Sequence, residues 1–376
     1  LTIHNKVFDI SDYKHPGGSI ILDMNNNDAT CIFYSTHPLY VWDLIESSSF
    51  KQKYQISETL NKDTYLYNDN FYIECKHTVD KYLLERVKKY GKYFDDIIVF
   101  SWTFTWLILG FLSYVNMLFN NGNEISSIIL GFTWSMVIFN IMHPSMHGGI
   151  CNTITPIKLI LDDTYTLLSG SSVPRWIDRH NIQHHSHTNT DKDTDKHTTP
   201  FIRLHPSQEK KWWYSYQHIY FPILAFTNTL SNQFTHLKYT WNNKKTGGFF
   251  RKTRIRHYYI SLMIWGSLAY LIPIYYFGVW NALYTSLIFQ SFGSFFATYN
   301  IVINHIFEGA YISNDSFCKS FAKRQVLSSC NHSTGSILGT FMTGGLNHQI
   351  EHHLFPSLAI HHYPLISNQS LLQSFY

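Results

Sequence analysis

The sequence predicts an α-helical integral membrane protein with four transmembrane helices in two hairpins, preceded by a small α+β unit. Three observations support this fold class. Charged residues make up only 14% of the 376 residues, against about 25% in average proteins. Long uncharged stretches occur in pairs. Many of the 22 histidines gather in short clusters between and after these stretches.

Residues 1–50 are predicted to form a small soluble unit, with a strand-like run at 6–10, a turn and helix-like stretches. The polar residues 51–69 predict a linker, and helical periodicity from residue 70 onward predicts a helix that Gly91 closes. We therefore assign 51–96 to a linker with an amphipathic helix and 97–376 to a membrane domain. The opening residues resemble the interior of a domain, so we expect the chain to be a fragment at its front.

Three uncharged stretches together provide four segments long enough to cross a bilayer. No charged residue lies between Asp96 and Glu124, and a second uncharged stretch runs over residues 125–142. A third, over residues 257–307, is long enough for two spans of about 20 residues with a turn near Gly278. These stretches predict two hairpins.

Basic residues are absent from the two outer turns, residues 120–124 and 277–281, and lie before, between or after the hairpins. The positive-inside rule then places the N-terminus and the histidine clusters on the cytosolic side, and we expect a multi-pass protein of the endoplasmic reticulum membrane. Residues 210–226 mix basic, aromatic and apolar side chains, which predicts a helix at the membrane surface. A fifth span there would break the charge pattern.

Three histidine clusters have spacings that suit metal binding. His143 and His147 are four residues apart, so they share one face of a helix. His180 and His184 share a face in the same way, with His185 about 100° round the helix. A third cluster repeats a spacing of three and four residues and consists of Gln349, His352 and His353.

Seven imidazoles are too many for one ion, so two metal ions are predicted. Imidazole suits iron, copper, nickel and zinc. A Cu(I) site would favour sulfur ligands, and a zinc hydrolase would normally use three ligands per ion, often with a carboxylate. Iron also performs oxygen chemistry and is therefore favoured. His305, just after the fourth span, is a further candidate ligand, whereas His361 and His362 are expected at the surface.

The N-terminal unit carries a separate signal. His15 lies on a turn completed by Pro16, Gly17 and Gly18, and His37 follows after a predicted helix. Two histidines on opposite walls of an apolar pocket can take both axial positions of a haem iron, which then carries electrons rather than binding O2. The five cysteines form no C-x-x-C pair, which indicates a reducing compartment. The net charge of +4 without a basic run argues against a nucleic-acid partner.

Several segments resemble known families. Residues 7–18 (VFDISDYKHPGG), with Asp28 and His37, resemble the haem-binding half of cytochrome b5. Residues 344–356 (GGLNHQIEHHLFP) are similar to the third histidine box of front-end fatty acid desaturases, in which Gln replaces the first histidine. Residues 179–189 (RHNIQHHSHTN) are similar to their second box.

This resemblance implies four spans capped by a cytosolic helical domain that holds a di-iron centre. It implies haem b ligated by His15 and His37, and electrons from NADH-cytochrome b5 reductase. It implies O2 and a fatty acyl-CoA or phospholipid acyl chain as substrates, with a double bond inserted between an existing one and the carboxyl end. Residues 304–309 resemble the Δ4/Δ5 branch more than the Δ6 branch. The implied metal residues are His143, His147, His180, His184, His185, His352 and His353, with Gln349 as the signature glutamine.

One departure leaves alternatives open. Pro144 stands where the first box usually has Asp, and proline constrains the residue before it, so the geometry of His143 is in question. A sphingoid long-chain-base Δ8 desaturase would share the haem unit and the Gln-type box. A b5-fused fatty acid 2-hydroxylase would lack the Gln349 motif. A membrane electron carrier with an inactive metal site is the alternative from another class.

Overall fold

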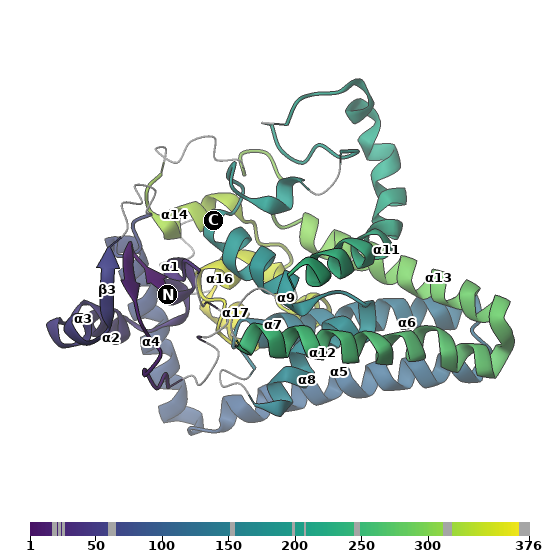
Figure 1. Cartoon of the computed structure of the whole chain (residues 1–376), viewed down its shortest axis with the longest axis horizontal. Helices are drawn as coiled ribbons and strands as arrows, with labels where there is room; N and C mark the ends of the chain where they lie inside the picture. Colours follow the sequence, from purple (N-terminus) through teal and green to yellow (C-terminus); the bar gives the residue numbers. More distant parts are fainter. Residues whose placement is uncertain are drawn as a thin grey trace.

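The computed structural model describes residues 1–16, 21, 24, 27–58, 65–150, 155–197, 200–206, 208–243, 249–310 and 318–367. Gly17 and Gly18 of the expected haem turn lie outside these residues. A small N-terminal unit lies at one end of the molecule, and long helices extend side by side toward the other end (Figure 1). Short helices that carry the histidine clusters lie between these two parts.

The N-terminal unit is a three-stranded antiparallel sheet with three helices. Its strands are ordered β1-β2-β3, where β1 is Thr2–Ile3, β2 is Lys6–Phe8 and β3 is Gln55–Glu58. Its helices are α1 (Thr30–Thr36), α2 (Leu39–Glu46) and α3 (Ser48–Tyr54). Because β3 pairs with β2, residues 51–58 belong to this unit and are not part of a linker. The boundary predicted at residue 50 is therefore too early.

Helix α4 (Asn70–Tyr90) joins the N-terminal unit to the rest of the chain. The Asp69 side chain caps its first turn, and Gly91 ends it at a φ of 90°, as the sequence predicts. Tyr72, which is fully buried, donates a hydrogen bond to the backbone carbonyl of Leu354 at 2.9 Å. The helix therefore packs directly on the histidine-bearing C-terminal segment.

Three helices in the described part of the chain are long and apolar enough to cross a membrane. They are α5 (Phe94–Phe119), the continuous helix Glu124–Met146 formed by α6 (Glu124–Val137), η2 (Ile138–Met142) and α7 (His143–Met146), and the 51-residue run Lys252–Val302. The last comprises most of α12 (Phe249–Gly266), then η6 (Ser267–Leu271) and α13 (Ile272–Val302).

The 51-residue run is not one straight helix. At about 1.5 Å per residue it would extend over roughly 77 Å, more than twice the ~30 Å apolar core of a bilayer. Phe277 and Gly278 have non-helical backbone angles, with Gly278 at a φ of 79°. The chain reverses there, so that α12 and α13 lie antiparallel (Figure 1). Large aromatic side chains are exposed at this end of the molecule, among them Phe119, Tyr275 and Trp280.

Helices α6 and α13 approach each other closely at a pair of glycines. A Cβ on Gly131 would lie 2.2 Å from the backbone oxygen of Phe289, and a Cβ on Gly293 would lie 2.9 Å from the backbone oxygen of Gly131. Only residues without a side chain permit this spacing, which is typical of helix pairs in membranes. Trp134 and Phe289 pack beside the glycine contact.

Helix α11 (Gln217–Asn242) is longer than the surface helix predicted at 210–226 and follows the short helix η5 (Trp212–Tyr216). It packs along α13 through polar side chains. Asn228 donates to the Thr298 hydroxyl at 3.1 Å, and Gln233 donates to the Gln290 side-chain oxygen at 2.8 Å. This helix is not among those apolar enough to span a membrane.

The glycine contact gives a direct test of the packing. Gly131→Ala should lower the free energy of unfolding by about 1–3 kcal/mol, because the added methyl group overpacks the α6–α13 interface. Gly266→Ala is the matched control, since a Cβ there meets nothing within 4 Å. Thermal unfolding of the purified protein in detergent measures both. Equal unfolding midpoints for the two variants would contradict the close approach.

Candidate metal centre

Four segments that are distant in the sequence bring eight histidines together. They are the end of the α6–η2–α7 helix, the segment formed by η3 (Ile177–His184) and α10 (His185–His187), the turn after α13, and α16 (Gln349–Leu354). The eight histidines are His143, His147, His180, His184, His185, His305, His352 and His353. His305 thus joins the three clusters predicted from spacing.

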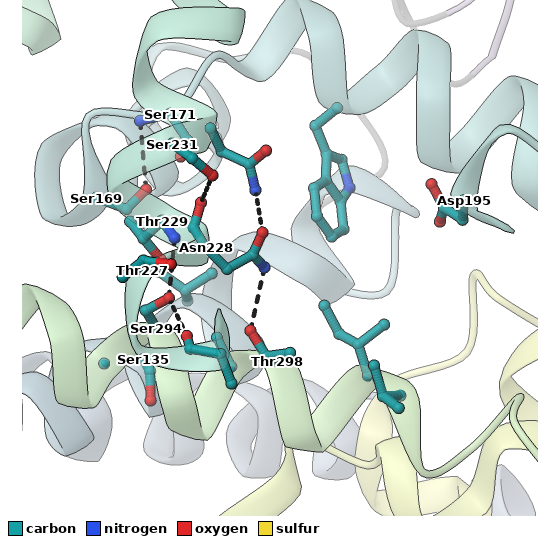
Figure 2. Close-up of a pocket in the computed structure, with 18 of the residues that line it drawn as sticks. Ser135, Ser169, Ser171, Asp195, Thr227, Asn228, Thr229, Ser231, Ser294 and Thr298 are labelled. Carbon is teal, nitrogen blue, oxygen red and sulfur yellow. Dashed lines mark hydrogen bonds between the residues drawn. The ribbon is translucent and has the colours of Figure 1, made fainter. Parts of the chain in front are cut away.

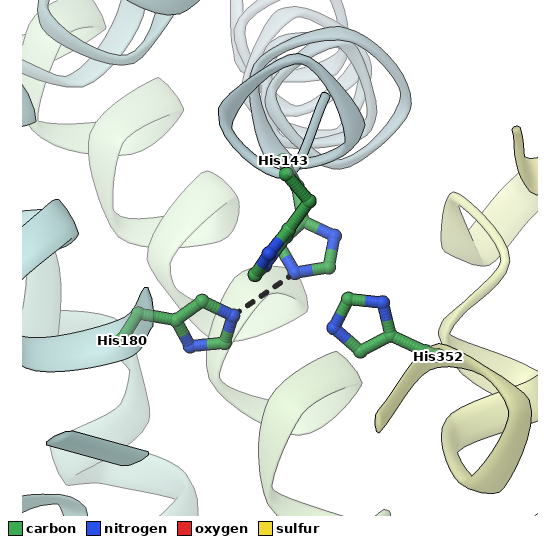
Figure 3. A group of neighbouring side chains, drawn as sticks. His143, His180 and His352 are labelled. Carbon is green, nitrogen blue, oxygen red and sulfur yellow. Dashed lines mark hydrogen bonds between the residues drawn. The ribbon is translucent and has the colours of Figure 1, made fainter. Parts of the chain in front are cut away.

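A first group consists of four histidines whose ligand atoms all lie within 4.8 Å of one another: His143, His147, His180 and His352. The Nε2 atoms of His143 and His180 are 3.1 Å apart. The rings of His143, His180 and His352 come from three different elements and point toward a common space (Figure 3).

A second group consists of His184, His305 and His353. The Nε2 of His305 lies 3.3 Å from that of His184 and 3.2 Å from that of His353. His185 lies between the groups. It forms a set with His352 and His353, and its Nε2 is 3.3 Å from the Nε2 of His180.

The helix that carries the second cluster is not a regular α-helix. Residues 177–184 form a π-helix, whose wider turn places residues five apart near one another. His180 therefore lies with the first group and His184 with the second, while the two also form a set with Asp195. His352 belongs to the first group and His353 to the second, and the two also lie together in the set with His185.

Pro144 does not displace His143. A second π-helical segment, η2, lies directly before it, and the His143 backbone N–H donates to the carbonyl of Ile138. His143 itself has helical backbone angles, with φ −57° and ψ −55°. A proline in a helix lacks one backbone donor and needs room at the preceding turn. The wide turn of η2 gives it that room, and His143 keeps its place in the first group.

Acceptors behind three of the rings select the tautomer. The Nδ1 of His184 lies 3.1 Å from an Asp193 carboxylate oxygen, and that of His305 lies 3.0 Å from the Ser328 carbonyl oxygen. The Nδ1 of His353 lies 2.8 Å from the Gln325 side-chain oxygen. Each acceptor accepts a hydrogen bond from a protonated Nδ1, which leaves the Nε2 lone pair directed into the site. Such outer contacts orient histidine ligands in metal sites.

The donor set fits bound metal ions. Nitrogens bound at about 2.0–2.1 Å, with angles of about 90–110°, lie roughly 3.0–3.4 Å apart, as these Nε2 atoms do. The Nε2 atoms of His147 and His352 are buried and have no hydrogen-bond partner among the described residues. A metal ion would satisfy these lone pairs.

Electrostatics favours the neutral imidazoles that bind metals. Burial, followed by the neighbouring histidines, holds the pKa well below its usual value at His147, His180, His185, His352 and His353. Burial lowers the pKa of His305 to about 3. At His184 burial also acts to lower the pKa, but the Asp193 carboxylate outweighs it and the pKa is raised. Neutral imidazole is the ligand form at physiological pH.

Gln349 lies against the second group. Its side-chain nitrogen is 2.8 Å from the Nε2 of His305, and its oxygen is buried without a partner. Other histidines face elsewhere: the Nδ1 of His187 contacts the Tyr65 hydroxyl at 3.1 Å. The expectation that His361 and His362 lie at the surface is wrong. His362 is buried against Tyr82 at 3.2 Å, and His361 contacts Asp95 at 3.1 Å.

A cavity of about 500 Å³ borders both groups. Its wall includes His180, His184 and His305, and it continues between α6, α11 and α13 as far as Gly131 and Phe289. This volume is typical of a site for a small-molecule or lipid chain. Polar side chains such as Asn228, Ser294 and Thr298 gather on one side of it, away from Asp195 (Figure 2).

The two expected haem ligands lie near each other in the N-terminal unit. The ring centroids of His15 and His37 are 5.8 Å apart, close to what two metal–imidazole bonds of about 2 Å on opposite sides of one ion require. The Nδ1 of His37 lies 3.0 Å from the Phe33 carbonyl oxygen, which leaves its Nε2 lone pair free for a metal. These residues fit axial ligation of a haem.

Comparison with known proteins is consistent with this centre. The family model described as fatty acid desaturase matches residues 124–374. The chain is 25% identical to Delta(5) fatty acid desaturase A of Dictyostelium discoideum, over 97% of this chain and 82% of that protein. It is 28% identical to an acyl-lipid (8-3)-desaturase of Physcomitrium patens, over 97% and 80%. No solved structure matches.

A shorter match includes the sn-1 linoleoyl-lipid 6-desaturase of Arthrospira platensis, at 27% identity over 64% of this chain and 67% of that protein. The family match covers the chain from the start of α6 onward, with all eight histidines of the centre, and membership implies non-haem iron. The chain belongs to the fatty acid desaturase family and is a fatty acyl desaturase.

Proposed function

We propose that this enzyme is a front-end desaturase, which inserts a double bond between an existing one and the carboxyl end of a lipid-linked acyl chain. The observation that carries the proposal is the shared wall of the cavity and the centre: His180, His184 and His305 line both. An extended chain in this cavity would pass both histidine groups. Relatives named Delta(5) and acyl-lipid (8-3)-desaturases support the regiochemistry.

The reaction balances as R–CH2–CH2–R′ + O2 + 2e⁻ + 2H⁺ → R–CH=CH–R′ + 2H2O. An unactivated C–H bond is too strong for acid–base chemistry, and a bound iron pair supplies the oxidising power. The protein contributes position and enclosure. Apolar side chains such as Ile138, Leu168 and Phe289 hold the acyl chain in the cavity and exclude water.

In this proposal each histidine group holds one of two non-haem iron ions. His143, His147, His180 and His352 serve one ion, and His184, His305 and His353 serve the other, with His185 between them. Gln349 is placed to serve the second ion, because its amide is next to His305. Asp193, Ser328 and Gln325 keep the Nδ1 atoms protonated and the rings in place.

A haem b held by His15 and His37 would supply the two electrons one at a time, and NADH-cytochrome b5 reductase would be its electron donor. Contacts between the N-terminal unit and the centre support this role. Helix α1 ends next to His37, and its Cys31 thiol donates to the backbone carbonyl of His185 at 3.4 Å. One helix thus connects the haem ligand with a metal-site histidine.

We further propose four membrane spans, with the break at Gly278 dividing the 51-residue run into two, in the endoplasmic reticulum membrane. The exposed aromatic side chains at the hairpin tips suit the far membrane interface, where such residues are favoured. The N-terminus and the histidine centre would then lie on the cytosolic side. That position gives the reductase access to the haem unit.

Expression in yeast fed polyunsaturated fatty acids and sphingoid bases tests the reaction. Gas chromatography–mass spectrometry of total lipids should show a new product whose added double bond lies nearer the carboxyl end. A strain with His184→Ala is the control for host activity. A sphingoid product alone would favour the long-chain-base alternative. Absence of any product, with haem and iron bound, would contradict the proposal.

Iron content tests the metal assignment. His184→Ala and His352→Ala each remove a nitrogen from one group, so non-haem iron should fall from two per chain toward one or fewer. His77→Ala is the control, because His77 is exposed on α4. Elemental analysis of the purified protein, corrected for haem, gives the ratio. Unchanged iron in both centre variants would contradict the assignment.

Haem binding is tested separately. His37→Ala should abolish the Soret absorbance of the purified protein, because a non-covalent haem with one axial ligand is weakly held. The His77→Ala protein should keep it. Full Soret intensity in the His37→Ala protein would show that His37 is not an axial ligand.

A further inference from the structure

Among the described residues, the cavity wall carries one arginine, Arg175, that forms no ion pair. Apart from histidines, the charged side chains lining the cavity are Arg175, Arg179, Asp193 and Asp195. Arg179 pairs with Asp195 at 2.5 Å, and Asp193 contacts the Nδ1 of His184 at 3.1 Å. Arg175 forms no ion pair within 4 Å with any described residue, and its Nε is buried without a hydrogen-bond partner.

The environment of Arg175 disfavours an isolated charge. Its guanidinium lies over the ring of Tyr239, 5.6 Å from the centroid, which compensates only part of the lost hydration. Burial, and after it the charge of Arg179, lowers the pKa of Arg175. A partly buried cation without a counterion has lost part of its hydration, and a bound anion would compensate for that loss. A guanidinium with free N–H groups recognises phosphate oxygens especially well.

The position of Arg175 places such an anion close to the metal centre. The Ser172 side chain caps α9 (Val173–Trp176) by accepting from the Arg175 backbone N–H, and α9 continues without a break into η3. Arg175 lies five residues before His180 in the sequence, and both side chains line the same cavity. An anion held by Arg175 would therefore share this cavity with the histidine groups.

Two phosphate-bearing substrates differ in how far the phosphate lies from the acyl chain. In a glycerophospholipid only the glycerol unit separates the phosphate from the acyl ester. In an acyl-CoA the long pantetheine arm separates the phosphates from the thioester. A phosphate held in the same cavity as the histidine groups suits the first arrangement, because there the phosphate and the acyl chain lie close together.

We propose that Arg175 binds the phosphate of a glycerophospholipid whose acyl chain occupies the cavity. The assignment rests on the proposed function and deepens it. The fixed spacing between Arg175 and the histidine groups then measures the distance from the head group to the reacting carbons. Front-end position follows from anchoring the lipid at its head rather than at its methyl end.

Binding to the purified full chain in dodecyl maltoside tests the assignment, with thermal stabilisation reporting affinity. The probes are dioctanoyl-phosphatidylcholine, dioctanoylglycerol with the same chains but no phosphate, and octanoyl-CoA. Wild-type protein should bind the phosphatidylcholine at least tenfold more tightly than the diacylglycerol. Arg175→Ala should weaken phosphatidylcholine binding about 10- to 100-fold, the usual effect of losing a charge-assisted hydrogen bond.

Two variants make this comparison specific. Arg256→Ala removes an exposed arginine of α12 and should leave the affinity unchanged. Arg175→Gln keeps much of the side-chain volume and should lose affinity for phosphatidylcholine as Arg175→Ala does. The glutamine variant therefore tests the assignment even if the alanine variant fails to fold.

Equal affinity of the wild type for the phosphatidylcholine and the diacylglycerol would overturn the assignment, as would full affinity in both Arg175 variants. Arg175-dependent binding of octanoyl-CoA alone would overturn the lipid source. Product formation by the wild type in yeast is scored independently. A product without Arg175-dependent binding would reject the head-group site and leave desaturation standing.

Discussion

Eight imidazole rings lie in contact with one another in a buried site, and their Nε2 lone pairs face a common space. Such an arrangement is unfavourable unless something binds those lone pairs, because buried polar atoms need partners. A carboxylate, a backbone carbonyl and a side-chain amide accept hydrogen bonds from the Nδ1 atoms of His184, His305 and His353. These hydrogen bonds orient the three rings and fix their tautomers. Much of the surrounding structure keeps the histidine-bearing segments at this separation.

Two local departures from α-helical geometry make the convergence possible. The π-helical segments η2 and η3 lie directly before or within the stretches that carry His143 and His180. A π-turn adds a residue to the helical repeat and redirects the side chains that follow, and such turns are frequent at functional sites. Here they admit a proline next to His143 and divide the histidines of η3 between two groups.

The shape of the cavity depends on how the long helices pack. The glycine contact holds α6 close to α13, while polar hydrogen bonds join α11 to α13 on the other side. The space between these helices leads from the histidine groups toward Gly131. The N-terminal unit closes the opposite side of the centre. Lys76 is buried there, donates to the His37 carbonyl at 3.0 Å and lies among the rings of Trp42, Tyr72 and Phe355, where burial lowers its pKa to about 7.

Composition and spacing alone determined the class of this protein and most of its centre. Charged residues are costly in lipid, so membrane spans are expected to be uncharged stretches of sequence. Clustered histidines at helical spacing indicate a metal site. Both patterns can be recognised in the sequence alone. Helix α4 and its end at Gly91 could also be predicted, because they depend on local sequence signals. The assignment of His180 and His184 to different groups could not be predicted from the sequence, because it depends on the π-helical turn of η3, which helical periodicity does not reveal. Burial of His362, the contact of His361 with Asp95 and the pairing of β3 with β2 likewise arise between segments that are distant in the sequence, which only the tertiary structure decides.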